Sequence, residues 1–226
     1  MMYTLAYAFM QAQKIESDSC IVTPLSYASA AETAKSRPLF LAAKTNMLYD
    51  IMAVPNIGFE AYVGHDITVS AQWMYAWWSK ASRSRYFRIY GGEIAGRYWF
   101  GKAAAGKPLT GHHAGVYVSA FTFDFQWGGT AYLGGRPGHS LWNRCMMSAG
   151  IEYGYSLPVA KHLNIDFSVG IGYVGGIVEK YKPVNDDYYT RKSVSRINWF
   201  GPTKAEISLV WLIGRDNVNA GKGGSR

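Results

Sequence analysis

The chain has 226 residues, of which 15% are aromatic and only 17% charged, and it carries a formal net charge of +8. Its length allows one ordinary domain or two small ones, and its aromatic residues provide enough apolar area to exclude a disordered chain. No stretch approaches the ~18 consecutive apolar residues of a membrane-spanning helix, so a helical membrane protein is excluded as well.

The first segment of interest is a short apolar stretch at residues 3–10. It resembles the last part of a secretory signal, although the basic segment that normally precedes such a stretch is missing. Residues 15–43 are mixed in composition and aperiodic, which is typical of a leader or linker. We therefore expect residues 1–43 to be an incomplete signal-like segment and linker of an exported protein, with a buried N-terminal helix as the alternative.

The two cysteines, Cys20 and Cys145, carry little information about fold or chemistry. They are too few for a disulfide scaffold and lack the spacing of a zinc site. The residues before Cys20 are not the apolar and small residues that precede a lipidated cysteine, so we do not expect a lipoprotein anchor. Whether the two cysteines pair with each other stays open at this point.

Alternation of apolar residues with polar or small ones is the main signal in the rest of the chain. It is clearest at residues 163–173, where large apolar side chains occupy the odd positions. A period of two residues predicts a β-strand. The same alternation, clean or weaker, predicts eight strands, at residues 44–54, 57–63, 67–77, 87–100, 112–125, 145–157, 163–173 and 203–213.

The connections between these strands alternate in length. The long ones, residues 126–141 and 179–196, fall on one side if the first strand rises, and both termini fall on the other side. Short periplasmic turns and longer outer loops are typical of bacterial outer-membrane barrels. We therefore expect an all-β fold, an eight-stranded antiparallel transmembrane β-barrel at residues 44–214. It is a meander with both termini periplasmic, followed by a short polar tail at residues 215–226.

The composition of the two strand faces distinguishes this barrel from a soluble barrel or sandwich. Each strand has an apolar lane, formed by its large apolar positions, and a second lane, formed by the positions between them. A solvent-exposed face would carry Lys, Glu and Thr, whereas the second lane here carries small residues such as Gly150, Gly154, Gly170 and Ser168. Small residues with a few charges suit the narrow lumen of an eight-stranded barrel. The apolar lane then faces lipid, where Lys or Arg would cost ~2–4 kcal/mol at the midplane. The clean apolar lanes contain neither.

Five short segments, in this order, resemble a known family: 44–50 (KTNMLYD), 55–60 (PNIGFE), 97–99 (RYW), 150–155 (GIEYGY) and 200–204 (FGPTK). The family comprises small, functionally uncharacterised outer-membrane β-barrels of gut-type Gram-negative anaerobes, catalogued as a domain of unknown function. The resemblance covers residues 43–214 and implies an eight-stranded barrel without established catalytic residues. It also implies a place in surface assemblies related to fimbriae.

Charged residues of the small-residue lane form the main candidate site. Six carboxylates on different predicted strands have three basic residues as counterions. The carboxylates are Asp50, Glu60, Glu93, Glu152, Asp166 and Glu206, and the basic residues are Lys44, Arg97 and Lys204. Buried charges need partners, so we interpret this set as a structural network of salt bridges and hydrogen bonds that fills the lumen. Acid–base chemistry by paired carboxylates and a small channel are the alternatives.

Other motifs give weaker indications of chemistry. Residues 170–175 fit the dinucleotide fingerprint GxGxxG, but the alternation continues through them and no helix pattern follows. Adjacent strand residues point to opposite faces, so His112 and His113 cannot chelate one metal. A lipid hydrolase could use Ser119 or Ser140 with His113 or His139. We expect no metal, no cofactor and no enzymatic activity.

Most of the remaining positive charge lies in the predicted outer loops, together with tyrosines. The candidate surface-binding residues are Arg83, Arg85, Tyr86, Arg136, Tyr188, Arg191, Lys192 and Arg196. This combination favours lipopolysaccharide phosphates, acidic glycans or a protein partner in a surface assembly, and we expect no nucleic-acid partner. The sequence therefore predicts a structural or interaction component of the bacterial outer membrane.

Overall fold

A computed structural model describes residues 40–80, 85–107, 109–127, 129–135, 141–185, 188–214 and 217–219. The chain divides into two units, Met1–Pro38 and Leu39–Arg226, and every described residue belongs to the second. Cys20 and nearly all of the predicted signal-like segment lie outside the described residues. Within the described part, none of the helices has the length and apolar character needed to cross a membrane.

Strands dominate the described part of the chain. In chain order the elements are β1 (Leu41–Asn46), α3 (Met47–Ile51), β2 (Asn56–Gly64), β3 (Ile67–Lys80), β4 (Arg85–Phe100), α4 (Gly101–Gly106), β5 (Gly111–Trp127), β6 (Ala131–Gly134), α5 (Leu141–Arg144), β7 (Met146–Ala160), β8 (Leu163–Asn185) and β9 (Tyr188–Ile213).

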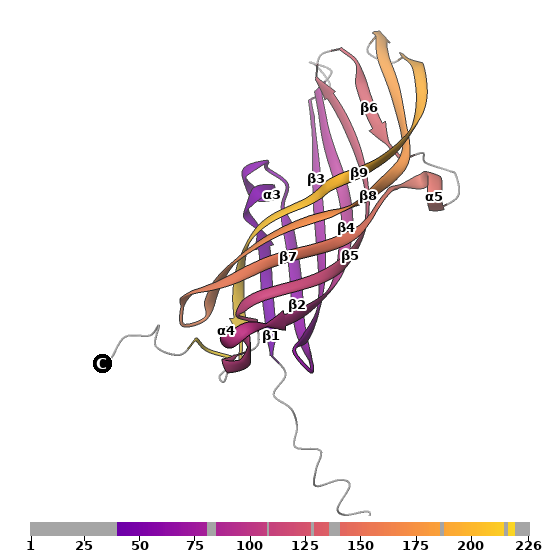
Figure 1. The fold of residues 1–226 in the computed structure, drawn as a ribbon. Helices are drawn as coiled ribbons and strands as arrows, with labels where there is room; N and C mark the ends of the chain where they lie inside the picture. The colour runs from indigo at the N-terminus through magenta and orange to yellow at the C-terminus, as the bar shows by residue number, and fades with distance from the viewer. Residues whose placement is uncertain are drawn as a thin grey trace, which may run out of the picture. The chain divides into compact units, whose positions relative to one another are not determined.

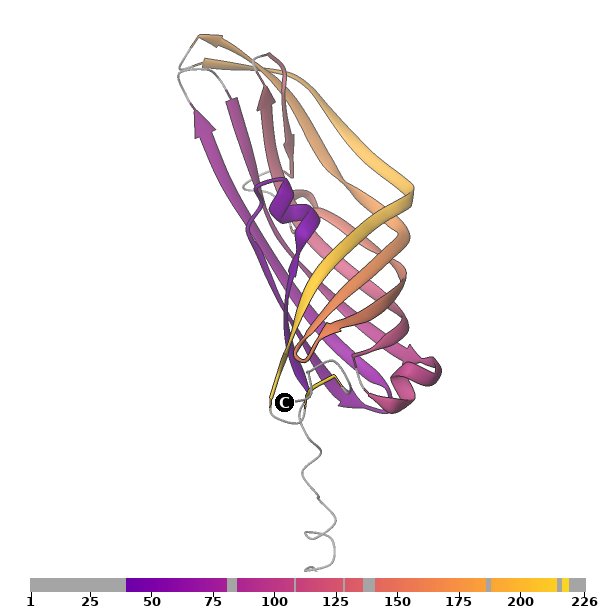
Figure 2. The same ribbon diagram turned by 90° about the vertical axis from the view of Figure 1, so that its left-hand side faces the viewer.

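All strand pairings are antiparallel, and they form one sheet that closes on itself (Figure 1, Figure 2). The ring runs through β1, β2, β3, β4, β5, β7, β8 and β9, and β9 pairs with β1 to complete it. The short β6 lies outside this ring order and pairs with β5 and β8 beyond the start of β7. The all-β, antiparallel arrangement and the ring of eight strands are thus confirmed.

The first predicted strand, residues 44–54, is wrong in its second half. Strand β1 ends at Asn46, and the chain then turns into helix α3. The Asn46 side chain accepts a hydrogen bond from the backbone N–H of Leu48, which caps the helix. Asp50 accepts hydrogen bonds from Thr45 (2.8 Å) and Asn56 (2.9 Å), and these bonds tie the helix to both neighbouring strands.

The two long predicted loops also differ from the structure. Strands β8 and β9 continue as a hairpin through most of residues 179–196, with pairing as far as Asn185 and Tyr188. Residues 190–200 are exposed at every position, so this part of β9 has no buried face that could produce an alternating pattern. The other predicted loop, residues 126–141, contains β6.

The interior of the ring is polar and its exterior is apolar. On β8, Asp166 and Ser168 are 1% and 3% exposed, whereas Val169 and Ile171 are 64% and 53% exposed. The ordinary polarity of a water-soluble protein is therefore reversed over the ring. Apolar clusters inside the ring are small; one of them joins Trp99 on β4, Ala104 on α4 and Leu212 on β9.

Candidate functional site

Arg97 on β4 is the centre of a charged network inside the ring. Its side chain is completely buried and donates to Glu152 on β7 (Nε to Oε1, 2.6 Å) and to Glu60 on β2 (Nη1 to Oε2, 2.9 Å). It also contacts Asp166 on β8 (3.2 Å) and Glu206 on β9 (3.3 Å). A guanidinium presents five donors in a rigid plane, which lets one side chain bind carboxylates from four strands.

Lys204 on β9 binds a second group of carboxylates. Its ammonium contacts Glu93, Glu152 (2.6 Å) and Glu206 (3.3 Å), and it lies 5.0 Å from the ring centre of Tyr117. Oxygen atoms of these three carboxylates lie within 4.8 Å of one another, a spacing that could hold a metal ion. The ammonium provides the positive charge at this point, so the group is a salt-bridge cluster.

Lys44 on β1 and several neutral groups complete the network. The Lys44 ammonium lies 3.2 Å from Glu206 and 4.0 Å from Glu60. The Thr68 hydroxyl donates to Glu60 (2.6 Å) and accepts a hydrogen bond from the Trp99 indole N–H (2.8 Å). Strands β1, β2, β3, β4 and β9 are thereby joined through side chains across the interior.

His113 on β5 extends the network toward Asp166. Its Nε2 lies 2.8 Å from the Asp166 carboxylate, and the imidazole packs against Trp99 at a tilt of 49° with ring centres 4.7 Å apart. The Ser168 hydroxyl donates to the same carboxylate at 3.2 Å. Together with Arg97, His113 and Ser168 give Asp166 three hydrogen-bonding partners, as a buried carboxylate requires.

The acidic residues of the network outnumber the basic ones. Five carboxylates face three permanent cations, which are Lys44, Arg97 and Lys204. Because each of the three cations contacts at least two carboxylates, removal of one cation takes a partner from several buried charges. The geometry therefore favours a rigid structural network.

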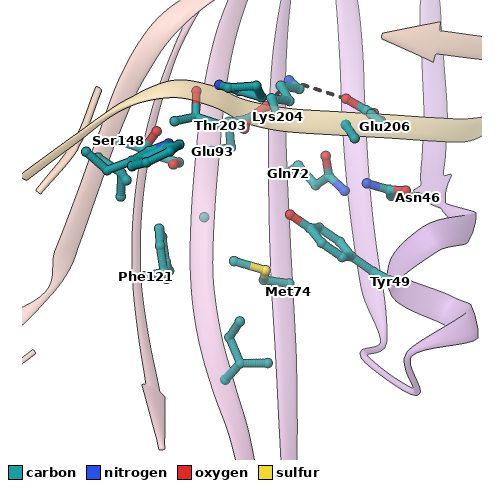
Figure 3. A pocket seen from close by; sticks show the side chains of 17 residues that line it. Asn46, Tyr49, Gln72, Met74, Glu93, Phe121, Ser148, Thr203, Lys204 and Glu206 are labelled. Carbon is teal, nitrogen blue, oxygen red and sulfur yellow. Dashed lines mark hydrogen bonds and ion pairs between the residues drawn. The ribbon is translucent and has the colours of Figure 1, made fainter. Parts of the chain in front are cut away.

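A cavity of about 410 Å³ adjoins the network on the side of helix α3. Glu93, Lys204 and Glu206 lie on its polar side, and Met74 and Phe121 contribute to its apolar walls. Tyr49 extends from α3 into this cavity (Figure 3). Burial raises the pKa of the Tyr49 hydroxyl above its ordinary value, and the negative charges of Glu93 and Glu206 raise it further.

The structure brings most of the predicted lumen residues together. Those that meet inside the ring are Lys44, Glu60, Glu93, Arg97, Glu152, Asp166, Lys204 and Glu206. Asp50 does not join them, because it lies exposed on α3. Sequence reasoning missed the part played by His113 and Thr68. Their positions in the inward-facing lanes of β5 and β3 are the signal that could have identified them.

The structure does not assemble the serine–histidine pair that it describes, and it places the glycine motif within a strand. Ser119 is not bonded to His113, since the imidazole uses Nε2 for Asp166 and its Nδ1 has no hydrogen-bond partner in the described structure. Ser140 and His139 lie outside the described residues. The glycines of residues 170–175 are part of β8, where Gly170 and Gly172 face the interior.

The predicted surface-binding residues that the structure describes lie on strands and not in loops. Arg85 and Tyr86 belong to β4, and Tyr188, Arg191, Lys192 and Arg196 belong to β9. Arg83 and Arg136 lie outside the described residues. Arg191 lies 3.7 Å from Glu179 on β8, and the Tyr86 ring stacks on the Arg88 guanidinium at 4.4 Å.

These features define the protein as a ring-closed antiparallel β-sheet with an ionic interior and an apolar exterior. The family described as "Protein of unknown function (DUF3575)" matches residues 20–213, so the chain belongs to this family. Comparison with curated proteins and with solved structures gives no match.

Proposed function

We propose that the protein is an eight-stranded β-barrel of the bacterial outer membrane that acts as a structural or interaction component of the cell surface. The observation that carries this proposal is the reversed polarity of the ring. Ile151 and Trp211 on the outer face are 66% and 60% exposed, whereas Glu152 and Glu206, which point into the interior from the same two strands, are 3% and 2% exposed.

Lipid is the solvent that suits such a surface. Contiguous apolar patches of this extent are rare on soluble monomers, whereas a closed ring of strands leaves no unpaired backbone edge for the hydrocarbon core. A tilted strand needs ~9–11 residues to span a bilayer. Strands β4 and β5 have 16 and 17 residues, which is enough to cross and to extend beyond the bilayer.

The charged network favours a closed barrel over the alternative of a small channel. Arg97 and its partners come from strands all around the ring and occupy its interior with side chains that make direct contacts. An open pore would need a continuous polar path past these residues. A lipid-modifying enzyme is the other alternative. Its candidate pair Ser119 and His113 is not bonded, because the imidazole Nε2 contacts Asp166 and Nδ1 has no hydrogen-bond partner in the described structure.

The proposed membrane-spanning barrel also implies an orientation and a class of partner. Both ends of the ring segment, Leu41 and Ile213, lie side by side on β1 and β9, and we place them on the periplasmic side. The hairpin of β8 and β9 then extends outward and presents Arg191, Lys192 and Arg196. These residues suit lipopolysaccharide phosphates or the acidic surface of a partner protein in a surface assembly. We propose no nucleic-acid partner.

Envelope fractionation tests membrane integration. The protein should separate with the outer membrane on a density gradient and stay in the pellet after a carbonate wash. A periplasmic protein with the same mass serves as the control for trapped soluble material. Release of folded protein into the carbonate supernatant would contradict the proposal and favour a soluble β-sheet protein.

A further inference from the structure

A hollow of about 370 Å³ lies on the outer face of the sheet, between β3, β4, β5, β6 and helix α5. Trp77 and Tyr90, which line it, are 49% and 42% exposed, whereas Ala76 and Gly91 beside them are buried. Because neighbouring strand residues point to opposite faces, Trp77 and Tyr90 point outward and the hollow opens to the exterior.

Arg88 on β4 forms the polar wall of this hollow. Its guanidinium carbon lies 4.7 Å from the ring centre of Trp77 and 4.4 Å from that of Tyr86, and its Nη1 lies 3.5 Å from the Asp124 carboxylate. These contacts fix its orientation. Its Nε is buried and has no hydrogen-bond partner in the described structure, so one donor of the fork is unused.

Arg144, the last residue of α5, is the second basic residue that lines the hollow. It is exposed and makes no salt bridge with a residue of the described part of the chain. Asp124 is the carboxylate that lines the hollow, and it already contacts Arg88 and accepts a hydrogen bond from the Tyr181 hydroxyl. The hollow therefore carries a net positive charge with an uncommitted guanidinium.

The position of the hollow on the sheet indicates the kind of anion. Trp77 lies opposite Arg88 in the strand register, and Tyr75 lies opposite Tyr90 one row closer to the apolar exterior. Further along the same face, Ile94 is 64% exposed. In a barrel that spans the membrane, Trp and Tyr at the edge of the apolar surface lie at the level of the lipid headgroups.

We propose that this hollow binds the phosphate-bearing headgroup of an outer-leaflet lipid, with Arg88 and Arg144 on the phosphate and the Trp77 and Tyr90 rings against the adjoining apolar part of the lipid. The guanidinium group of arginine matches the geometry of two phosphate oxygens. The rings of Trp and Tyr can pack against the apolar part of the lipid while their N–H and O–H groups stay in contact with water. This inference rests on the proposed membrane location and names a partner for it.

Native mass spectrometry of the full-length protein, folded in detergent, tests the proposal. The probes are dioleoyl phosphatidic acid, dioleoylglycerol, which has the same chains without phosphate, and inorganic phosphate. The protein should retain phosphatidic acid about a hundredfold better than dioleoylglycerol, because a charge-assisted hydrogen bond from each of the two arginines contributes about tenfold. Millimolar inorganic phosphate alone should not displace the retained lipid.

Two substitutions and a matched control identify the site. Arg144→Gln removes the uncommitted guanidinium, and Arg88→Lys keeps the charge but removes the fork. Each should reduce retention of phosphatidic acid about tenfold. Lys102→Gln changes an exposed basic residue on α4 and should leave retention unchanged. A heat-dependent shift in gel migration shows that each variant is folded.

Several results would overturn the inference. Equal retention of both lipids would mean an apolar hollow only, and displacement by inorganic phosphate would mean a free-phosphate site. Unchanged retention in folded Arg144→Gln and Arg88→Lys would move the lipid elsewhere. If the wild-type protein resists the carbonate wash but shows no selectivity for phosphatidic acid, only this inference is wrong. If carbonate releases the folded protein, the proposed function itself is wrong.

Discussion

Arg97 and Glu206 connect diametrically opposite strands of the ring. Arg97 lies on β4 and Glu206 on β9, four strand steps apart in either direction, and their Nη2 and Oε2 atoms are 3.3 Å apart. A direct contact of this kind is possible only where the interior is filled by side chains from wall to wall. Small residues on the inward-facing sides of the strands keep the ring narrow enough for this contact, and the contact in turn fills the interior.

Replacement of Arg97 by Met should destabilise the protein strongly. The substitution removes the charge but keeps much of the volume, and it leaves four carboxylates in the interior without their shared partner. Breaking a buried ionic network in this way costs about 3–5 kcal/mol in the free energy of unfolding. Urea unfolding in detergent micelles measures the effect, with Lys102→Met as an exposed control. Equal midpoints for Arg97→Met and the wild type would contradict the structural role.

Substitution of Gly150 should reveal how tightly the strands approach. A Cβ atom at this position would lie 2.4 Å from the Ile171 carbonyl oxygen and 2.7 Å from the Tyr117 hydroxyl. Gly150→Ala should therefore cost about 1–3 kcal/mol in unfolding free energy. Gly96→Ala is the matched control, because a Cβ there meets nothing within 4 Å and should be neutral or slightly stabilising. Equal effects of the two substitutions would mean that the interior is looser than described.

The filled interior should also prevent steady ion flow. The protein reconstituted in planar bilayers should show no stable conductance, because Arg97 and Lys204 contact carboxylates from several strands across the interior. An open barrel porin in the same bilayer serves as the positive control. Large and stable openings of the wild-type protein would favour the channel alternative.

Lys107, which follows helix α4, should make stability depend on pH. Burial lowers its pKa to about 8, below the ~10.4 of an unfolded lysine, although its ammonium donates to Asn219 (3.0 Å). Between these values the unfolded state binds more protons, so stability should rise as pH increases from about 8 to about 10. The effect is small because the side chain is partly exposed to water. Lys107→Met should lose this part of the rise in urea midpoint, and an identical pH profile would contradict it.

The sequence predicts the ring well where one face of a strand is buried. On β8 the alternation of Phe167, Val169 and Ile171 with small and polar residues gives the strand and its two faces directly. It fails on the outer part of β9, because residues 190–200 are exposed on both faces and no burial constrains their order. The prediction also fails at α3, where local hydrogen bonds of Asn46 and Asp50 end the strand although most of residues 47–54 are apolar.

The sequence identifies most of the residues of the candidate site but does not predict which of them contact one another. Charged residues in the small-residue lanes, such as Glu60 and Asp166, are identifiable because an unpaired charge has no place on an apolar face. Which carboxylates share Arg97 depends on the stagger between strands that are distant in the chain. Glu60 and Glu206 reach the same guanidinium only because the pairing of β1 with β9 closes the ring and fixes that stagger.

Contact between the outer face and lipid chains tests the central claim most directly. Trp73 and Trp211 are more than half exposed on the outer face, whereas Trp99 is 3% exposed in the interior. In vesicles of phosphatidylcholine brominated in the middle of its chains, tryptophan fluorescence should be clearly lower than in unbrominated vesicles. Trp73→Phe combined with Trp211→Phe should reduce this quenching, and Trp99→Phe should not. Equal fluorescence in both kinds of vesicle, with the protein folded, would contradict a membrane-spanning barrel.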